Sequence, residues 1–295
     1  MNWDNIRVFL AVARASQFSG AASQLGLDVA TVGRRVNALE SSLNFRLLER
    51  GRTGCVLTAA GERFYRAADE VESQILRAQS DLSRSDIEVA GTIRIAAPDA
   101  FSTLFLCPRV GSLKAKHPGL TVQLVPISRT FSLSKREADI AVTLERPAKG
   151  RLVARKLIDY SLHLYASRPY LKERGIPSRA EDLQHHCLVA YVQDLIPAEQ
   201  LTFMPEIYGP TYSRLECSTA VGQLEAVRGG AGIGVLHDYT AQQSEGLEIV
   251  LPDIRFDRTY WLVTHLDTRG LSRIQAAVEH ILGEVSMHKR MFQVK

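Results

Sequence analysis

The chain has 295 residues, which is more than one domain of ordinary size requires. Apolar residues make up 45% of it and charged residues 23%, and these values exclude a wholly disordered, collagen-like or coiled-coil chain. The net charge is only +4, so a nucleic-acid partner has to be argued from where the basic residues lie, not from their total.

The sequence carries no sign of export or of a membrane segment. No run of about 18 apolar residues occurs, and Asp4, Arg7 and Arg14 lie where a signal peptide would have its apolar core. The four cysteines are far apart and form no Cys-x-x-Cys, which argues against a zinc finger or a secreted disulfide framework. We therefore expect a cytoplasmic protein with free thiols.

Three short helices are predicted near the N-terminus. Ser19 is placed to cap a second helix that runs to Leu25, and Asp28 is placed to cap a third helix after a turn at Gly26. The first helix has apolar residues with the helical period at Ile6, Phe9, Leu10 and Ala13. The third helix has a similar stripe, which we expect to be buried, at Val29, Val32, Val36, Leu39 and Leu43.

The stripe of the third helix leaves a polar face that suits DNA. The outward residues near its start are Ala30, Thr31, Arg34 and Arg35. Alanine and the threonine methyl can contact a thymine methyl, and arginine can reach guanine or a phosphate. The spacing of Ala22, Gly26 and Val32 fits a helix-turn-helix. A plain three-helix bundle with solvated arginines is the alternative at this point.

A basic hairpin follows the third helix. Residues 46–50 and 55–58 are predicted to form two short strands around a glycine-rich turn, which is the pattern of a wing. Arg50 and Arg52 at its tip would contact the phosphate backbone. Residues 34–66 contain seven arginines and three glutamates, a local charge of 7 − 3 = +4. This concentration of charge favours the DNA-binding interpretation.

A long helix with an apolar seam is predicted after Thr58. Its seam residues recur at steps of four and three, as in a coiled coil: Phe64, Ala68, Val71, Ile75, Ala78 and Leu82. Pairing with a second copy would bury this seam. The two heads of such a homodimer would then read two half-sites related by two-fold symmetry on double-stranded DNA.

Residues 3–61, from Trp-Asp-Asn-Ile-Arg-Val-Phe-Leu-Ala-Val-Ala through Leu-Leu-Glu-Arg to Leu-Thr-Ala-Ala-Gly, resemble the N-terminal domain of LysR-type transcriptional regulators. The helix after Thr58 resembles their linker helix. In that family the start of the third helix contacts promoter DNA, which implies this role for Ala30, Thr31, Arg34 and Arg35. The commonest members begin this helix with Ser-Gln and have Ser before the arginine. This chain has Asp28-Val29 and Gly33 instead, so a glutamine contact to a base is absent.

The rest of the chain alternates strands with helices, the pattern of an α/β fold. The expected strands are 92–97, 120–126, 139–143, 161–166, 187–191, 232–236 and 260–264. Three segments resemble the LysR effector domain, which has the two-lobed fold of type 2 periplasmic binding proteins. They are Gly91-Thr-Ile-Arg-Ile-Ala-Ala, Arg136-Glu-Ala-Asp-Ile-Ala-Val and Gly229-Gly-Ala-Gly-Ile-Gly-Val-Leu.

The resemblance implies a division into a winged helix-turn-helix at 1–58, a linker helix and hinge at 59–90, and an effector domain at 91–295. Lobe one would comprise 91–161 with 266–295 and lobe two 162–265, and the strands near Ser161 and Thr264 would act as hinges. The effector domains would pair as well as the linkers, which makes a homotetramer the expected assembly.

The resemblance also places a small-molecule effector between the lobes, against strand ends and helix N-termini. The residues expected there are Pro98, Asp99, Ala100, Phe101, Ser128, Arg129, Thr130, Tyr191, Gln193, Ser218 and Thr219. We expect an anionic effector, because the guanidinium of Arg129 can grip a carboxylate while neighbouring hydroxyls fix the rest of the molecule.

Other motifs carry less weight. The glycines of residues 230–234 follow a predicted helix and precede a strand, which is the reverse of the order in a dinucleotide-binding loop. His185 and His186 are adjacent and have no third ligand at suitable spacing, so no metal or other cofactor is predicted. A redox pair of Cys187 and Cys217 is a weaker hypothesis.

Catalysis is not expected, because no Gly-x-Ser-x-Gly or P-loop motif is present and the sequence alone reveals no nucleophile–base pair. An enzyme with a DNA-binding head is still an alternative. So is a regulator whose cleft is closed and needs no effector. A transport-type binding protein would share the body but would have no reason to carry a helix-turn-helix.

Overall fold

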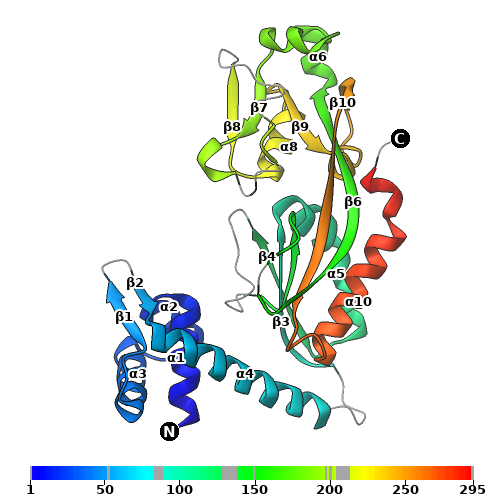
Figure 1. Ribbon diagram of the computed structural model, residues 1–295. Helices are drawn as coiled ribbons and strands as arrows, with labels where there is room; N and C mark the ends of the chain where they lie inside the picture. Colours follow the sequence, from blue (N-terminus) through cyan, green and yellow to red (C-terminus); the bar gives the residue numbers. More distant parts are fainter. Residues whose placement is uncertain are drawn as a thin grey trace. The chain divides into compact units, whose positions relative to one another are not determined.

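The computed structural model describes residues 2–51, 54–82, 89–127, 138–148, 150–196, 198, 201–203 and 213–293. The chain divides into two compact units (Figure 1). The first unit contains Met1–Ile87, which we call the head, together with Ser132–Glu137 and Leu266–Leu271. We call the unit of Glu88–Phe131, Ala138–His265 and Ser272–Lys295 the body. None of the helices in the described ranges is long and apolar enough to cross a membrane.

Three helices build the head: α1 (Trp3–Ala15), α2 (Phe18–Leu25) and α3 (Val29–Leu43). The turn between α2 and α3 passes through Gly26, whose φ of 65° is the left-handed conformation that glycine adopts without strain. Apolar side chains of the core between the helices are fully or almost fully buried, among them Phe9, Leu10, Val32, Val36 and Leu39. The predicted helix-turn-helix is therefore present as a packed unit.

The cap of α3 is as predicted, and that of α2 is not. The Asp28 carboxylate accepts a hydrogen bond from the Thr31 N–H at 2.7 Å. The prediction that Ser19 caps α2 was wrong, because α2 begins one residue earlier than this serine. The N-cap is Gln17, whose side chain makes no capping hydrogen bond, and Ser19 lies within the first turn of the helix.

Val29 also differs from its prediction. It was expected in the buried stripe of α3, but half of it (50%) is exposed. The Asp28 cap makes Val29 the first residue of the helix, so its side chain lies at the end of the helix and not against α2. Val32, nearly one turn later, is fully buried.

The wing consists of β1 (Leu48–Gly51) and β2 (Gly54–Leu57), which pair antiparallel with Leu48 opposite Leu57. The buried carboxylate of Glu40 on α3 holds the start of this hairpin. One of its oxygens accepts the N–H groups of Leu47 and Leu48 at 2.7 and 3.1 Å. The wing is thus attached directly to α3, the helix predicted to meet DNA.

A long helix, α4 (Ala59–Leu82), leaves the wing. The Thr58 hydroxyl accepts the Gly61 N–H at 2.9 Å and so caps its first turn. Gly61 is required by packing, because a Cβ there would lie 1.9 Å from the carbonyl oxygen of Leu47. Arg14 of α1 pairs with Asp69 and Glu72 of α4 at 2.8 and 2.5 Å, which joins the helix to the rest of the head.

The predicted apolar seam of α4 has two parts. Phe64 and Ala68 pack on the core of their own head, and the Phe64 ring lies 5.6 Å from the ring of Phe9. Val71 and Ile75 are 48% and 39% exposed. The prediction of one continuous intermolecular seam was therefore wrong for its first two residues, because α1 already covers them.

Strands β3 to β10 of the body form one sheet in the order β4-β3-β5-β10-β6-β9-β7-β8. Their bounds are β3 (Gly91–Pro98), β4 (Leu120–Ile127), β5 (Ile140–Thr143), β6 (Leu152–Ser167), β7 (Leu188–Tyr191), β8 (Arg214–Cys217), β9 (Ile233–His237) and β10 (Leu247–His265). The long strands β6 and β10 pair antiparallel and pass through the middle of the body (Figure 1). β3 to β5 lie on one side of them, in lobe one, and β7 to β9 on the other, in lobe two.

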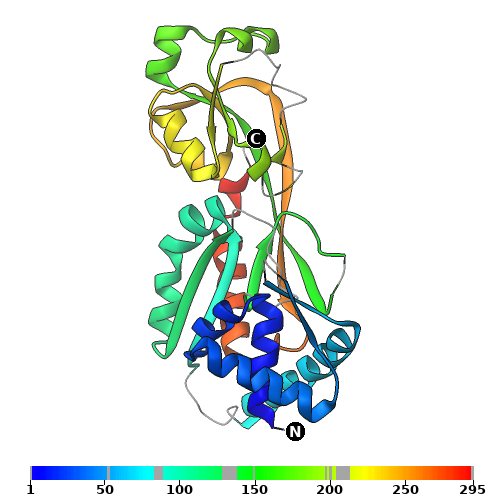
Figure 2. The same ribbon diagram turned by 90° about the vertical axis from the view of Figure 1, so that its left-hand side faces the viewer.

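Helices cover both lobes of the body. Those of lobe one are η1 (Phe101–Leu106), η2 (Cys107–Arg109), α5 (Val110–Lys116), α10 (Ser272–Met287) and η7 (Lys289–Phe292). Those of lobe two are α6 (Arg168–Arg174), η4 (Ala180–His185), η5 (Gln193–Leu195), α8 (Ala220–Arg228) and α9 (Asp238–Ala241). α5 and α10 lie against the strands of lobe one (Figures 1 and 2).

The register of β7 and β8 excludes a disulfide between Cys187 and Cys217. These strands run parallel with Tyr191 opposite Cys217, whereas Cys187 precedes the first residue of β7. Four residue steps along a strand amount to about 13 Å, which is far beyond the Cα separation of a disulfide. Cys187 and Cys217 therefore cannot form the redox pair considered from the sequence.

Candidate functional site

The outward start of α3 carries a short chain of hydrogen bonds. The guanidinium of Arg34 donates to the Thr31 hydroxyl at 2.8 Å, and that hydroxyl donates to the Asp28 carboxylate at 2.8 Å. The hydrogen bond from the Thr31 N–H holds the pKa of Asp28 below its usual value. The cap, the hydroxyl and the exposed arginine thus form one ordered polar group at the start of the helix.

Two neighbours complete this face. Ala30 and the half-exposed Val29 add apolar surface, and Val29 is a residue that the sequence stripe assigned to the core. Its position directly after the Asp28 cap was the signal that it would be exposed. Arg35 turns toward α1, where its guanidinium lies 3.5 Å from the Asp4 carboxylate.

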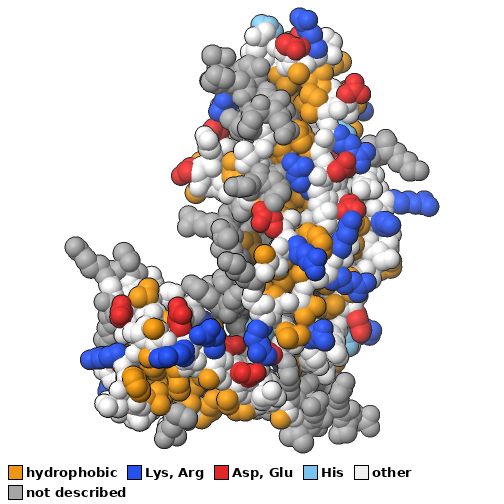
Figure 3. Space-filling view, in the orientation of Figure 1, with side chains coloured by type: hydrophobic (Ala, Val, Ile, Leu, Met, Phe, Trp, Pro, Cys, Tyr) orange, Lys and Arg blue, Asp and Glu red, His pale blue; other side chains and the backbone are white. Residues whose placement is uncertain are grey.

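The wing residues predicted to contact phosphate, Arg50 and Arg52, lie only partly within the described residues. The backbone of Arg50 lies in β1. Its side chain, and the whole of Arg52, lie outside the described residues. On the face of the head drawn in Figure 3, basic side chains are interspersed with acidic and apolar ones.

The body contains a cavity of about 330 Å³. Its described lining comes from the ends of β3, β4, β5, β7 and β9 and from the segment after η5: Pro98, Asp99, Ala100, Ile127, Val142, Thr143, Leu144, Glu145, Pro147, Tyr191, Ala198, Leu201 and His237. Most of these side chains are apolar, and a few are polar or acidic. This composition is typical of a pocket for a small organic molecule.

Asp99 is the polar residue of the cavity with the clearest partner. It follows β3 of lobe one, and its carboxylate accepts the N–H of Val221, in the first turn of α8 of lobe two, at 3.0 Å. Burial raises the pKa of the Asp99 carboxyl, although this N–H and those of Ala100 and Ala220 favour its charged form. The carboxylate therefore connects the two lobes beside the cavity.

An aromatic stack leads from the central strands to the cavity. The rings of Tyr160 on β6 and Tyr260 on β10 stack at 4.1 Å with an interplanar angle of 15°. The imidazole of His237 stacks on Tyr160 at 5.5 Å and 20°. Burial lowers the pKa of His237 to about 4, so the ring is neutral at physiological pH.

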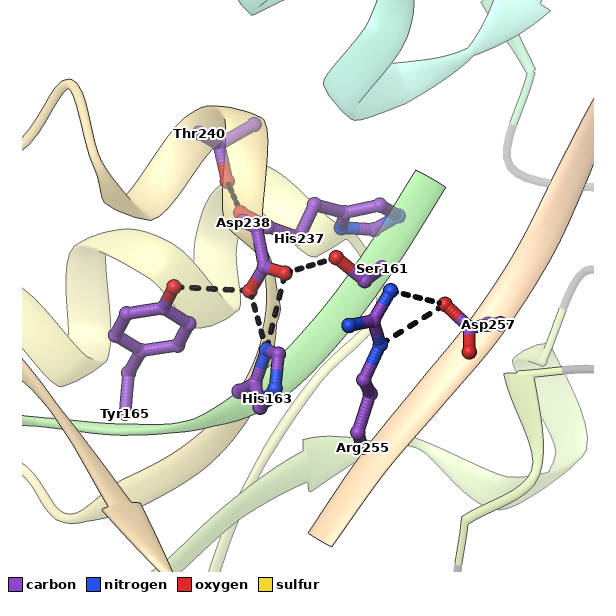
Figure 4. A network of polar contacts seen from close by, with 8 residues as sticks. All are labelled: Ser161, His163, Tyr165, His237, Asp238, Thr240, Arg255 and Asp257. Carbon is purple, nitrogen blue, oxygen red and sulfur yellow. Dashed lines mark hydrogen bonds and ion pairs between the residues drawn. The ribbon is translucent and has the colours of Figure 1, made fainter. Parts of the chain in front are cut away.

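A buried polar network lies next to His237 (Figure 4). The carboxylate of Asp238 is fully buried and accepts hydrogen bonds from the side chains of Ser161, His163 and Tyr165, which are alternate residues of β6. Because serine and histidine both face the carboxylate, this is not the serine–histidine contact that activates a nucleophile. The network instead fixes α9 to the central strand.

The structure places the residues predicted to bind an effector in three groups. Pro98, Asp99, Ala100 and Tyr191 line the cavity. Phe101 is fully buried among Phe105, Tyr260 and Phe292, and Gln193, Ser218 and Thr219 are likewise not among the described lining residues. Thr219 instead caps α8 by accepting the Gly222 N–H. Ser128, Arg129 and Thr130 lie outside the described residues.

Sequence reasoning missed much of the cavity wall. The missed residues are Ile127, Val142, Thr143, Leu144, Glu145, Pro147, Ala198, Leu201 and His237. The rule that ligands bind beyond the carboxyl ends of parallel strands could have found residues 142–145 and His237, because they end or directly follow predicted strands. Ala198 and Leu201 belong to a segment without a periodic pattern, so the sequence did not indicate that they line the cavity.

Comparison with known proteins agrees with this arrangement. Residues 3–62 match the family model of the bacterial regulatory helix-turn-helix protein of the lysR family, and residues 87–286 match that of the LysR substrate binding domain. An HTH-type transcriptional regulator of Haemophilus influenzae is 30% identical over 61% of this chain and 63% of its own length. The regulator CrgA of Neisseria meningitidis is 29% identical over 63% of each chain.

These matches span about three fifths of the length of the curated relatives. Among solved structures, ArgP from Mycobacterium tuberculosis has the same fold over 96% of both chains, with a TM-score of 0.68 and 19% identity. The family model of the LysR substrate binding domain alone covers more than half of the residues of the present chain. The chain therefore belongs to the LysR family.

Proposed function

We propose that the protein is a sequence-specific transcriptional regulator, which binds double-stranded DNA at a promoter operator through its head and is controlled by a small molecule bound in its body. The observation that carries this proposal is the capped start of α3, which presents Arg34 outward in the same chain as a two-lobed body with a cavity. The relatives named above are transcriptional regulators, which agrees with the expectation that the chain is not an enzyme.

The chemistry of the α3 face supports contacts in the major groove. Arg34 can donate two parallel hydrogen bonds to guanine, and the methyl groups of Val29 and Ala30 can pack on a thymine methyl. The hydrogen bond to Thr31 holds the Arg34 side chain along the helix before DNA arrives. Arg35, held beside Asp4, is proposed to reach the backbone or a base after exchanging this partner.

The test separates reading of sequence from attraction to phosphate. DNA selected from a random pool by the full-length protein is compared with unselected DNA for each variant. Arg34→Ala should lose about 1–3 kcal/mol on selected DNA and much less on unselected DNA. Arg52→Ala should weaken both alike and reduce the salt dependence of binding by about one unit of slope.

Arg228→Ala, which removes an exposed arginine from the body, is the matched control and should change neither affinity. An equal loss on both DNAs for Arg34→Ala would contradict its role in reading the sequence.

We propose further that the protein acts as a homodimer through α4 and assembles into a homotetramer through its bodies. The exposed Val71 and Ile75 support the first step, because they extend one apolar stripe on the helix beyond the part that the head covers. The homotetramer rests on the family resemblance.

The effector is proposed to bind in the cavity between the lobes, where four of the residues predicted from the sequence meet. An open volume of about 330 Å³ favours this over a regulator whose cleft is closed. The anionic effector and its grip by Arg129 stay a prediction. The test is calorimetry on wild type and Arg129→Ala, and equal affinity of both for an anion would contradict that grip.

A further inference from the structure

Among the described residues beside the cavity, the group best suited to attract an anion is already occupied by the protein. The first turn of a helix offers free N–H groups and a positive dipole end, and α8 directs its first turn toward the cavity residue Asp99. The Val221 N–H is taken by the Asp99 carboxylate at 3.0 Å. A ligand carboxylate or phosphate would have to displace this side chain to reach the same amide.

The remaining described wall offers an anion no compensation. Asp99 and Glu145 are acidic, and none of the described lining residues is a lysine or an arginine. His237 stays neutral above its pKa of about 4, and burial raises the pKa of Tyr191 well above its usual value, so that it stays neutral as well. The described lining therefore contributes two carboxyl groups and no cationic side chain, and Glu145 has a further partner of its own.

Apolar side chains form most of the remaining wall. Ile127 ends β4, and Val142 and Leu144 lie at the end of β5, on the other side of β3 in lobe one. Leu201 comes from lobe two. Such a surface fits the hydrocarbon part of a ligand. The cavity thus combines a hydrocarbon surface with an acidic group at the junction of the two lobes.

We propose that this cavity binds an organic cation, an amine attached to an apolar body, whose ammonium group lies beside Asp99. The inference rests on the proposed effector role and specifies its chemistry. The ammonium pairs with the carboxylate oxygens, while the α8 amide keeps its hydrogen bond. An anion would instead lose the amide to Asp99 and meet a like charge at short range, where the local dielectric is lower than in water.

The charge preference can be measured with three probes that share one body: 2-phenylethylamine, 2-phenylethanol and phenylacetate. Calorimetry on the full-length protein near pH 8 gives the affinity of each. We expect the amine to bind at least about tenfold more tightly than the carboxylate, with the alcohol between them. Phenylacetate binding as tightly as the amine would overturn the inference and would favour the anion predicted from Arg129.

Asp99→Asn tests whether this residue causes the preference. Asparagine keeps an oxygen that can accept the Val221 N–H, so the variant removes the charge and preserves the clasp between the lobes. The ratio of amine to carboxylate affinity should fall about tenfold. Asp253→Asn, which removes an exposed charge of β10 outside the described lining, should leave the ratio unchanged. Equal effects of the two substitutions would overturn the role of Asp99.

The experiment distinguishes failure of the proposed effector site from failure of the proposed charge preference. If none of the three probes binds wild type or Asp99→Asn at millimolar concentration, the cavity does not take a small organic molecule of this size. That result would reject the effector site, and the charge assignment with it. Binding with the wrong order of affinities rejects the charge assignment alone.

Discussion

Single side chains that satisfy backbone groups hold the parts of the head in place. Glu40 is the clearest case, because one oxygen of its buried carboxylate accepts the N–H groups of Leu47 and Leu48. A buried N–H without an acceptor costs about 1–3 kcal/mol. The position of the wing relative to α3 therefore depends on this glutamate.

Replacing Glu40 by alanine should loosen the start of the wing. The amides of Leu47 and Leu48 should exchange with solvent about thirtyfold faster, which corresponds to roughly 2 kcal/mol. Hydrogen–deuterium exchange on the full-length protein measures this locally. Glu40→Gln keeps an acceptor oxygen and should show a smaller change. Unaltered protection in Glu40→Ala would mean that other contacts hold the wing.

His237 should make the body sensitive to acid. Its pKa falls from 6.5 to about 4 in the folded protein, so the unfolded chain binds a proton more readily in this range. The contribution of His237 to stability is therefore complete above pH 6.5 and is lost as the pH falls toward 4, by about 3 kcal/mol. Urea unfolding of the full-length protein across this range measures the loss.

The control is His237→Phe, which keeps a ring to stack on Tyr160 and cannot be protonated. Its unfolding free energy should depend less on pH than that of wild type over the same range. Identical pH profiles for the two proteins would show that His237 is not protonated on unfolding.

At the level of helices and strands, α4 divides its apolar residues between its own head and a proposed partner. Burying Val71 and Ile75 in a dimer is worth roughly 1.5–3 kcal/mol per side chain. The double variant Val71→Asp with Ile75→Asp should therefore lose the α4 dimer and most of the DNA affinity. Analytical ultracentrifugation and DNA titration measure the two effects.

Ile176→Asp is the matched control for the α4 variant, since it places a charge at an isoleucine that is 70% exposed in the body. It should change neither the sedimentation nor the DNA affinity. Unchanged sedimentation of the double variant itself would mean that α4 does not pair with a second copy.

The elements that were predicted from sequence are those with a strong local pattern. α3 and the wing were predicted because a capping aspartate, an apolar stripe and two glycines agree with one another. β8 was not predicted, because it has four residues and two of them, Leu215 and Glu216, are exposed. The full length of β6 was missed because charged residues such as Arg155 and Lys156 occupy its solvent-exposed positions, while its pairing with β10 is long-range.

The sequence predicted only those lining residues of the candidate cavity that end or follow a strand. Asp99 and Tyr191 follow or end strands with clear patterns, so both were found. The hydrogen bond from Val221 to Asp99 joins residues 122 positions apart, and no local pattern indicates it. The sequence therefore could not indicate that the Asp99 carboxylate lies at the junction of the two lobes.

On the scale of the whole molecule, control of a promoter requires that the head recognise a particular DNA sequence. Specific regulators bind their sites roughly 10³–10⁷ times more tightly than random DNA at physiological salt. A dimer of heads further requires two half-sites related by two-fold symmetry, with their centres separated by whole turns of the double helix.

Selection of genomic fragments by the full-length protein, followed by competition against random DNA at physiological salt, tests this requirement most directly. We expect enrichment of one two-fold symmetric sequence that wild type binds at least about a thousandfold more tightly than random DNA, and that Arg34→Ala binds with reduced preference. Fragments retained without a common sequence, and displaced equally well by random DNA, would contradict it.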